Sequence, residues 1–489
     1  MLFDTIRLIS SLVASLIGAP TQVASFTYDA NGLVETITET DTTSHSVPYS
    51  TNGQTRVWTF TYTTASGVKL LTGIDGPRTD VSDTTAYQYT AAGYLSRITN
   101  AVGHQINIAS HDGMGRPLGI TDQNGIVTDL EYTPRGWLKK STVRHGTGDA
   151  VTSIEYSPAG DVTKVTLPDG SFLTYAYDDA RRLTAIANQS GEKIEFAYDL
   201  ARNVTQQVTK DSGGTVKRTQ TRAYDELSRL LRLVGAATQT TTLGYDNNSN
   251  LVALTDPLNK TTGFGFDALN RLITATDPLM GARNTGYDPQ DNVTSESDER
   301  NVATSYVHNG FGEVIQEASP DGGTIVYVRD SAGNVTQKTD ARGQVSTSSY
   351  DALNRITATT FAGAPTFNIT YSYDSTAGGN FGIGRLTSVT DVSGQTAIKY
   401  DHRGNAVRED RTIGGVLYTT EYKYDLADNL IEIVYPSGRI LTYVRDALGR
   451  VTSVTTKANA AALSVNVATG ITYMPFGPPA AARPCPVTL

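Results

Sequence analysis

Hydrophobic and polar residues alternate in short runs along most of the chain. In residues 126–132, for example, Ile126, Leu130 and Tyr132 fall on one face of an extended strand, whereas Asp129 and Glu131 fall on the other. The runs are rich in Thr, Val, Ile and Tyr, which favour strands over helices. A period of two residues predicts β-strands with one buried face.

The alternating runs return at a fixed interval. The clearest stretch is Phe266 to Val335, where a phrase that begins at Phe266 starts again at Tyr287, His308 and Arg329, 21 residues apart each time. Further copies begin at Tyr28, Tyr89, His111, Tyr132, Tyr156, Tyr177, Tyr198, Tyr224, Tyr245, Tyr350, Tyr373, Tyr400, Tyr424, Arg445 and Tyr473. Such a period predicts a repeat architecture that fills nearly the whole chain.

Each copy contains a turn centred four residues after its aromatic. In most copies this position holds Gly or, less often, Asn or Asp, which accept a positive φ. We predict structural turns at Gly32, Gly93, Gly115, Gly136, Asn270, Gly312, Gly333, Asn354, Gly404 and Gly449. A second turn follows about eleven residues after the aromatic, as in residues 122–125 and 256–259, where Asp opens the turn and Gly or Asn closes it.

One repeat is therefore a hairpin of two short strands. A lone hairpin buries too little apolar surface, so neighbouring copies must pair edge to edge. Roughly 18 copies give roughly 36 strands, and an open sheet of more than about ten strands curls because strand twist accumulates. The predicted fold class is all-β: a long array of antiparallel β-hairpins that curls into a spiral, partly hollow β shell.

The column of repeat aromatics has two interpretations. Its best-placed members are Tyr132, Tyr177, Tyr198, Tyr245, Phe266, Tyr287, Tyr350 and Tyr424. We expect them to be packing residues of the shell, with the following Asp bonded to backbone N–H groups of its own turn. Aromatic faces beside carboxylates also suit the hydroxyl and C–H groups of sugars, so carbohydrate binding is the alternative.

The repeated phrase closely resembles the YD repeat of bacterial Rhs-repeat proteins and of animal teneurins. Close matches are residues 350–356 (Tyr-Asp-Ala-Leu-Asn-Arg-Ile) and 445–451 (Arg-Asp-Ala-Leu-Gly-Arg-Val), and the resemblance covers about residues 26–477. In that family the repeats build a spiralling β cocoon around a carried C-terminal domain, often a toxin. The resemblance therefore implies a shell whose partners are a cargo or toxin domain and the remaining shell segments.

The chain also departs from the family pattern. Toxin-carrying members close the shell with a terminal core that contains a DPxGL-like motif, where self-cleavage frees the cargo. Asp256-Pro257 and Asp277-Pro278 are repeat turns without the following Gly-Leu. We therefore assign no protease site and no toxin, and expect a partial member that lacks the terminal core.

Composition narrows the remaining function classes. The net charge is −9 and charged residues make up 18% of the chain, which gives no basic footprint for nucleic acid. The single Cys485 lies near the end of the chain, so no internal disulfide framework is expected. The six histidines are scattered, and none forms a Cys/His cluster for zinc. We predict no enzymatic activity, no catalytic residue, no metal and no cofactor.

One short motif resembles the start of a calcium loop. Asp246, Asn248 and Asn250 place oxygen side chains at alternate positions, but Leu251 stands where such a loop needs Gly and Pro257 where it needs Glu. Turn chemistry explains this motif better than metal binding.

Three segments are expected. Residues 1–25 are an N-terminal segment, residues 26–477 the repeat array, and residues 478–489 a Pro-rich disordered tail. Leu2, Ile6 and Ile9 recur at helical spacing, so the first segment is an amphipathic helix on or in the shell, a weak export signal, or an artefactual start within a longer gene. It is too short to span a bilayer and makes no convincing signal peptide. Export or surface association in a bacterium is implied by the resemblance alone.

The predicted function is that of a noncatalytic structural shell of an Rhs-like toxin system, which encloses or displays a C-terminal cargo. The alternative is a carbohydrate or cell-surface binding module that uses exposed turns. Its best candidate is the glycine-rich loop 374–385, which we expect to be mobile.

Overall fold

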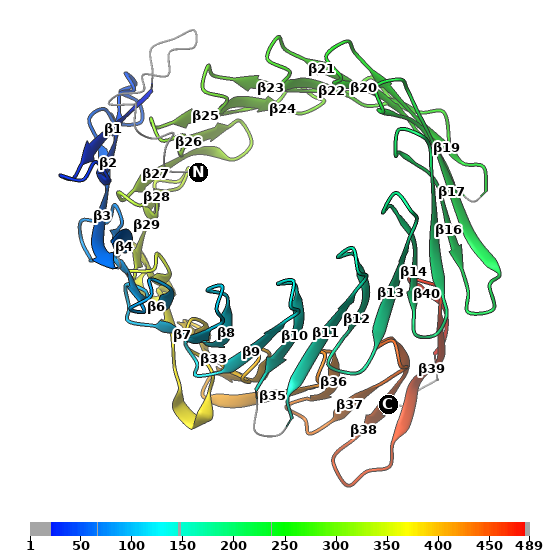
Figure 1. Ribbon diagram of the computed structural model, residues 1–489. Helices are drawn as coiled ribbons and strands as arrows, with labels where there is room; N and C mark the ends of the chain where they lie inside the picture. Colours follow the sequence, from blue (N-terminus) through cyan, green and yellow to red (C-terminus); the bar gives the residue numbers. More distant parts are fainter. Residues whose placement is uncertain (1–20, 66, 145–147, 236, 485–489) are drawn as a thin grey trace.

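The fold is one antiparallel β-sheet, described by a computed structural model for residues 21–65, 67–144, 148–235 and 237–484. The sheet has 40 strands. Each strand pairs with the next one along the chain, so the ribbon is an uninterrupted meander (Figure 1). The alternation of apolar and polar residues is thus satisfied by hairpin after hairpin, as the 21-residue period predicts.

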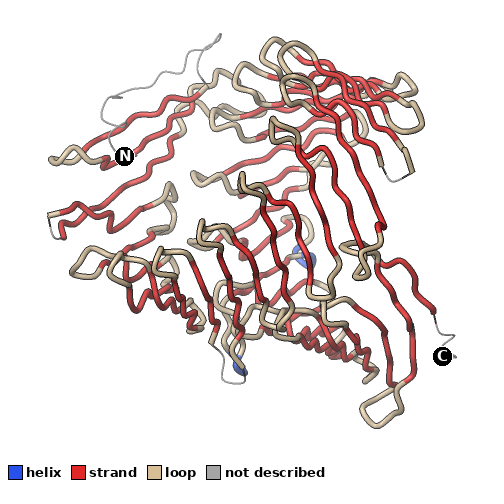
Figure 2. The backbone as a smooth tube through the Cα atoms, turned by 45° about the vertical axis from the view of Figure 1, so that its right-hand side comes forward, coloured by secondary structure: helices blue, strands red, loops and turns tan. Residues whose placement is uncertain are grey.

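The strands are β1 Gln22–Tyr28, β2 Val34–Asp41, β3 Thr55–Ala65, β4 Val68–Asp75, β5 Thr85–Tyr89, β6 Leu95–Thr99, β7 Gln105–His111, β8 Pro117–Thr121, β9 Val127–Tyr132, β10 Leu138–Val143, β11 Ala150–Tyr156, β12 Val162–Thr166, β13 Phe172–Tyr177, β14 Leu183–Asn188, β15 Lys193–Tyr198, β16 Val204–Lys210, β17 Val216–Tyr224, β18 Leu230–Val234, β19 Thr240–Tyr245, β20 Leu251–Thr255, β21 Thr261–Phe266, β22 Leu272–Thr276, β23 Ala282–Tyr287, β24 Val293–Ser297, β25 Ala303–His308, β26 Val314–Ser319, β27 Gly323–Arg329, β28 Val335–Thr339, β29 Val345–Tyr350, β30 Ile356–Phe361, β31 Ile369–Tyr373, β32 Leu386–Asp391, β33 Gly394–Tyr400, β34 Ala406–Ile413, β35 Val416–Tyr424, β36 Leu430–Val434, β37 Ile440–Arg445, β38 Val451–Lys457, β39 Val465–Tyr473 and β40 Pro479–Pro484. Two short 3₁₀ turns, η1 Pro365–Phe367 and η2 Ala377–Gly379, interrupt the meander (Figure 2).

Most reversals at both edges of the ribbon use the same five-residue turn. At the edge that follows the repeat aromatics, the backbone N–H of Asp267 donates to the carbonyl of Arg271 and that of Asn270 donates back to Asp267, both at 3.0 Å. At the other edge, Asp256 exchanges the equivalent bonds with Lys260 and Asn259, at 2.9 and 3.0 Å. We call the first kind aromatic-edge turns and the second kind far-edge turns.

In most of these turns an aspartate side chain fixes the reversal. Oδ1 of Asp267 accepts the backbone N–H groups of Leu269 and Arg271 at 2.9 and 3.0 Å, and Asn270 lies at φ +62°. This arrangement satisfies two N–H groups of the reversal and places the fourth residue in the left-handed region, where Gly and Asn are favoured. A β-bulge at the preceding aromatic, here between Gly265 and Phe266, completes the reversal.

The sheet is a single layer and has almost no conventional core. Among the hydrophobic residues described, only Ala150 and Ile315 are buried, at 9% and 1% exposure. Thirteen polar or charged residues are buried, among them Asp41, Arg78 and Glu192. A 40-stranded protein without an opposing layer keeps most of its apolar side chains only half covered, so side-chain packing along the sheet and hydrogen bonds must hold it together.

The ribbon curls into a spiral that overlaps itself. In Figure 1 the described backbone forms a ring with a free middle, and β33 to β39 run beside β8 to β14. The turn between β14 and β15 meets the turn between β37 and β38, so about 23 strands make one revolution. At about 4.8 Å per strand, the circumference is at least about 110 Å.

The prediction of an all-β spiral array is confirmed, with differences of detail. The structure has 40 strands rather than roughly 36. β1 begins at Gln22, before the expected boundary at residue 26, and β40 occupies Pro479–Pro484, within the stretch expected to be a disordered tail. β40 pairs with β39, which explains why its Pro-rich sequence is ordered there: its prolines at 479 and 484 stand at the ends of the strand. Residues 1–20, with the expected amphipathic helix, lie outside the described residues.

Replacing Gly333 by Val tests the turn geometry. Gly333 lies at φ +87°, and a Cβ there would collide with the carboxylate of Glu313. We expect Gly333→Val to destabilise the protein by about 1–3 kcal/mol from backbone strain alone. Ser331→Ala, in the same turn, should change stability by less than about 0.5 kcal/mol. Equal urea midpoints for the two variants would contradict the assignment.

Candidate functional site

Neighbouring repeats are joined by a Tyr, an Asp and an Arg. Oδ2 of Asp267 accepts a hydrogen bond from Nε of Arg271 at 2.7 Å. The Arg271 guanidinium lies 4.7 Å above the ring of Tyr287, in the next repeat. The hydroxyl of Tyr287 donates to the carbonyl of Leu272 at 3.0 Å. Each copy thus holds the following one through a charge-assisted hydrogen bond, a cation–π contact and a capped carbonyl.

The same unit recurs around the shell. Guanidinium groups lie over aromatic rings in the pairs Arg116–Tyr132, Arg182–Tyr198, Arg229–Tyr245, Arg355–Tyr373 and Arg450–Tyr473. The backbone N–H of Arg271 and its side chain hold the pKa of Asp267 below its usual range. The turn thus stabilises the ionised form of the Asp267 carboxylate.

The structure distributes the predicted site residues along one edge instead of gathering them. All ten predicted turn residues, Gly32, Gly93, Gly115, Gly136, Asn270, Gly312, Gly333, Asn354, Gly404 and Gly449, lie at φ between +60° and +93°. The eight repeat aromatics each end a strand, namely Tyr132, Tyr177, Tyr198, Tyr245, Phe266, Tyr287, Tyr350 and Tyr424. The hydroxyls of six of them donate to a carbonyl of the preceding repeat, at 2.6 to 3.2 Å, in Tyr177, Tyr198, Tyr245, Tyr287, Tyr350 and Tyr424.

The calcium-like motif is a turn of the ordinary kind. Oδ1 of Asp246 accepts the N–H groups of Asn248 and Asn250 at 2.9 and 2.8 Å, and Oδ2 accepts Nδ2 of Asn250 at 2.9 Å. Within residues 21–65, 67–144, 148–235 and 237–484, no three His, Cys, Asp or Glu side chains are grouped as metal ligands would be. None of the helical turns in this part of the chain is long and apolar enough to cross a bilayer.

The polar groups that do come together lie where the second revolution meets the first. We call this contact the seam. It joins far-edge turns of the first revolution to aromatic-edge turns of the second, with one added bond from the hydroxyl of Tyr49 to the carbonyl of Tyr327 within β27. Its hydrogen-bonded partners are 258 to 278 residues apart in sequence. The two edges of the ribbon are therefore complementary. One revolution shifts the ribbon along the spiral axis by about the length of one strand.

The seam begins at the turn after β2. Oδ2 of the buried Asp41 accepts the backbone N–H of Gly310 at 2.6 Å. Arg56 forms a 2.7 Å ion pair with Glu313 and stacks 4.0 Å from the Phe311 ring. Burial tends to raise the pKa of Asp41, but hydrogen bonds from Thr43 and Gly310 outweigh it and lower the pKa.

Arg78 joins three turns at once. Its side chain is 2% exposed and pairs at 2.7 Å with Asp80 in its own loop. Across the seam, Nη1 donates to the carbonyl of Asp351 and to Oδ1 of Asn354, both at 3.0 Å. Asp330 lies 3.6 Å from Nε. A buried guanidinium with this many acceptors fixes the relative position of the two revolutions.

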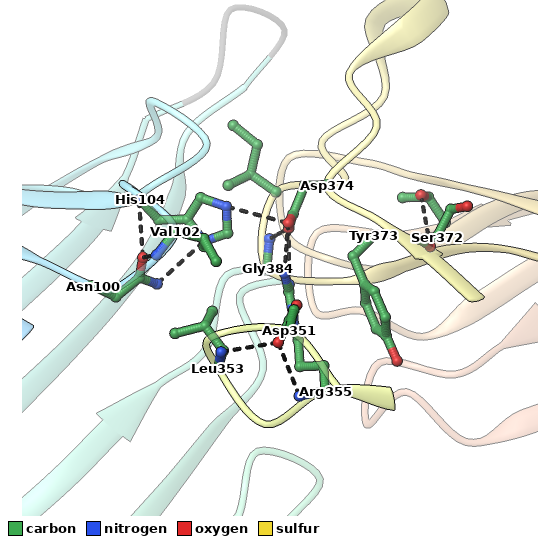
Figure 3. A network of polar contacts seen from close by, with 12 residues as sticks. Asn100, Val102, His104, Asp351, Leu353, Arg355, Ser372, Tyr373, Asp374 and Gly384 are labelled. Carbon is green, nitrogen blue, oxygen red and sulfur yellow. Dashed lines mark hydrogen bonds and ion pairs between the residues drawn. The ribbon is translucent and has the colours of Figure 1, made fainter. Parts of the chain in front are cut away.

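Loop 374–385 fills the next part of the seam (Figure 3). Asp374 accepts hydrogen bonds from Arg355 at 2.7 and 3.0 Å, and its Oδ2 lies 3.4 Å from Nε2 of His104 in the first revolution. The N–H of Gly384 donates to the same carboxylate at 2.6 Å. Figure 3 shows Asp374 between His104 and Arg355, so it is the junction of the network.

The rest of this loop also packs against the first revolution. The backbone of Ile383 exchanges hydrogen bonds of 3.0 Å with the side chain of Asn124. Asn380 is 7% exposed and bonds to the backbone of β33. Parts of loop 374–385 are thus bonded to the first revolution and to β33, whereas its mobility stays a prediction. Of its glycines, Gly384 at φ +82° lies so close to Gln123 of the first revolution that a Cβ there would collide. Only residues 376–379 and 384 are exposed.

Another seam contact joins the turn between β14 and β15 to the turn between β37 and β38. Nη1 of Arg450 lies 2.9 Å from Oε1 of Glu192, whose side chain is 11% exposed. The same guanidinium bonds to Asp446 within its own turn at 2.8 Å. Arg450 therefore holds its turn and the seam together.

The seam was missed because a repeat pattern describes neighbours along the ribbon only. A signal was nevertheless present, since seam turns break the consensus. At residues 309–313 the turn reads Asn-Gly-Phe-Gly-Glu, with Glu313 in the slot that holds Arg271 and Asn292 in other copies. Arg78 and Asp80 sit in an irregular loop, and the substitution of Asn188 and Glu192 for the usual turn residues marks another contact.

Comparison with known proteins gives two matching family models. The RHS Repeat model matches residues 156–192, 329–366 and 424–461, and the Teneurin YD-shell model matches residues 184–344. No curated protein sequence matches the chain.

Solved structures share the fold at low sequence identity. The crystal structure of TcdB2–TccC3 superposes with a TM-score of 0.72 at 12% identity, over 95% of this chain and 31% of that one. TcdB2–TccC3 without its hypervariable C-terminal region gives 0.71 at 11% identity, and TcdB2–TccC3–Cdc42 gives 0.71 at 10%, each over 95% of this chain and 33% of that one. The chain spans about a third of the length of these solved chains.

Replacing Arg78 by Met tests the seam. The change removes a 2% exposed guanidinium that pairs with Asp80 and Asp330 and donates across the seam to residues 351 and 354. We expect a loss of about 2–4 kcal/mol, because one partner of buried ion pairs and hydrogen bonds is removed. Arg342→Met is the matched control, because Arg342 is 81% exposed and pairs only with Asp340. An exposed pair of this kind contributes about 0–1 kcal/mol. Indistinguishable unfolding curves for the two variants would show that the seam carries little stability.

Acidification should loosen the seam at Asp374. Burial tends to raise the pKa of Asp374, but the hydrogen bonds from Arg355 and Gly384 outweigh it and lower the pKa. A lowered folded-state pKa stabilises the protein fully above the ordinary Asp pKa of about 3.9, and this contribution is lost as the pH falls through the folded value.

Hydrogen exchange of the peptide that contains Ile383 and Gly384 measures this effect. After correction for intrinsic rates, we expect constant protection from neutral pH to about 5 and a steep loss below about 4. Asp374→Asn should exchange faster at neutral pH and show a flatter profile. Protection that is the same at pH 3 and pH 7 would rule out a role for this carboxylate.

Proposed function

The chain belongs to the Rhs and YD-repeat family, and from that premise we propose that it is a noncatalytic shell segment which, with further shell segments, encloses a cargo domain. The family and the fold are those of a structural shell. The cargo is a polypeptide domain, such as a toxin, carried on the same or an associated chain.

The observation that carries the proposal is a curled sheet without a second layer. Only two hydrophobic residues are buried among those described, so most apolar side chains of the sheet have no partner layer within this part of the chain. The described backbone leaves the middle of the ring free in Figure 1. A curved surface of this extent is suited to contact with an enclosed polypeptide.

The hydrogen bonds of the repeated Asp, Arg and Tyr side chains support a noncatalytic role. The turn aspartates accept N–H groups of their own turns, the arginines bind those aspartates, and the tyrosine hydroxyls cap carbonyls. Side chains that make the same contacts in repeat after repeat have a structural role in the shell wall. Catalytic groups, in contrast, converge on one place.

Further shell segments are the second proposed partner. The chain spans about a third of the solved TcdB2–TccC3 chains. In Figure 1 the strands from β17 to β25 lie in one revolution only, without the second revolution that accompanies β8 to β14. We infer that segments of the same repeat type extend the wall over this part.

Small-angle scattering on the purified chain tests the shell. We expect a pair-distance distribution weighted towards long distances, as for a hollow body, because mass lies in a wall around an empty middle. The Arg78→Met variant should increase the maximum dimension if the seam holds the spiral closed. A distribution typical of a filled globule, or of an extended ribbon in the unaltered chain, would contradict the proposal.

A further inference from the structure

A cavity lies in the seam between the first and second revolutions, and none of the contacts described above uses it. Its volume is about 450 Å³, within the usual range of small-ligand sites. The first revolution contributes the ends of β9, β10 and β11 and the turn after β12, and the second contributes the turns that begin at Asp401 and Asp425. Figure 1 shows these two parts of the ribbon side by side.

One wall of the cavity is apolar. It consists of Ile126, Val143, Ala150, Leu167, Pro168 and Leu426. Val143 and Ala150 are paired across β10 and β11, which makes this part of the wall a rigid piece of sheet. Ala150 is one of the two buried hydrophobic residues of the described chain.

The lining also includes two guanidinium groups, of Arg403 and Arg385. Arg403 is 10% exposed, and its Nη2 donates to the carbonyl of Asp425. Its Nε lies 3.0 Å from Oδ1 of Asp428 as an ion pair, yet neither Nε nor Nη1 has a hydrogen-bond acceptor in line among the described residues. A buried N–H donor without an acceptor costs about 1–3 kcal/mol, so a guanidinium in this position favours an incoming acceptor.

Arg385 supplies a second guanidinium. It stacks 5.6 Å from the ring of Tyr400, and Nη1 donates to the carbonyl of Phe381. In the part of the chain that the structure describes, no carboxylate lies within 4.0 Å of it, unlike the arginines of most other turns. The cavity therefore holds two guanidinium groups beside apolar side chains. Arg403 has nitrogen donors without acceptors, and Arg385 has no carboxylate partner among the described residues.

From this arrangement we propose that the seam cavity binds a small organic monocarboxylate with an apolar body. The carboxylate accepts hydrogen bonds from Arg403 and Arg385, for which planar bidentate acceptors are well suited. The apolar body packs on Val143, Ala150 and Leu426. A dianion such as phosphate fits less well, because Asp122 and Asp428 line the same cavity.

Such a ligand would bridge the two revolutions. Its carboxylate is held by arginines of the second revolution, and its body lies between Val143 and Ala150 of the first revolution and Leu426 of the second. Because a ligand that binds only the closed seam stabilises that state by mass action, the ligand should tighten the spiral. The site is thus independent of the enclosed cargo.

Isothermal titration of the full chain with hexanoate tests the proposal, with hexanamide and inorganic phosphate as comparison probes. We expect saturable binding of hexanoate, and no binding of hexanamide at the same concentrations. Arg403→Gln and Arg385→Gln should each weaken hexanoate binding by about ten- to a hundredfold, the value of a charge-assisted hydrogen bond. Arg300→Gln, a change of a 71% exposed arginine elsewhere, should leave it unchanged.

A second variant separates loss of the site from loss of the fold. Leu426→Trp keeps both arginines and fills the cavity, so it should abolish binding while the circular dichroism spectrum and melting temperature stay near those of the unaltered chain. Failure of hexanoate to bind the unaltered chain would overturn the proposal. So would equal binding of hexanamide, preferential binding of phosphate, or full binding by the Leu426→Trp variant.

Discussion

The whole ribbon depends on one small interaction, a carboxylate or amide oxygen that accepts two backbone N–H groups in a five-residue turn. Asp267 does this at the aromatic edge and Asp256 at the far edge, with the same geometry. Because each reversal is locally satisfied, a strand needs no distant partner to turn back on its neighbour. Forty strands can then follow one another in sequence order, and the sheet grows without crossovers.

The turns also supply the means by which the ribbon meets itself. A repeat unit fixes its neighbours through Arg271 above Tyr287, and the same type of arginine, Arg450, reaches across the seam to Glu192. Contacts between neighbouring repeats and contacts across the seam are thus made by the same groups, namely Asp and Arg side chains and the backbone amides of turns. The difference is burial: Arg78 at the seam is 2% exposed, whereas Arg342 in an outer turn is 81% exposed.

Much of the fold could be predicted from sequence because its determinants are local. The period of 21 residues, the turn glycines and the alternation in runs such as residues 126–132 led to strands, turns and a curled array. The seam could not be predicted in this way, because the contact of Asp374 with His104 joins residues that no repeat relates. Loop 374–385 shows the same limit: its sequence does not indicate that Ile383 bonds to Asn124 or that Gly384 packs against Gln123.

The seam has a consequence for how such a chain can change in length. Along the ribbon, deletion of one repeat removes two strands and rejoins equivalent edges, so local pairing survives. Around the ring, however, the deletion moves all later strands by two strand positions relative to the first revolution. Arg450 then no longer faces Glu192. The seam contacts therefore fix which strand of the second revolution lies beside which strand of the first. Gain or loss of repeats is therefore compatible with the seam only in numbers that restore this alignment, or outside the overlapping part.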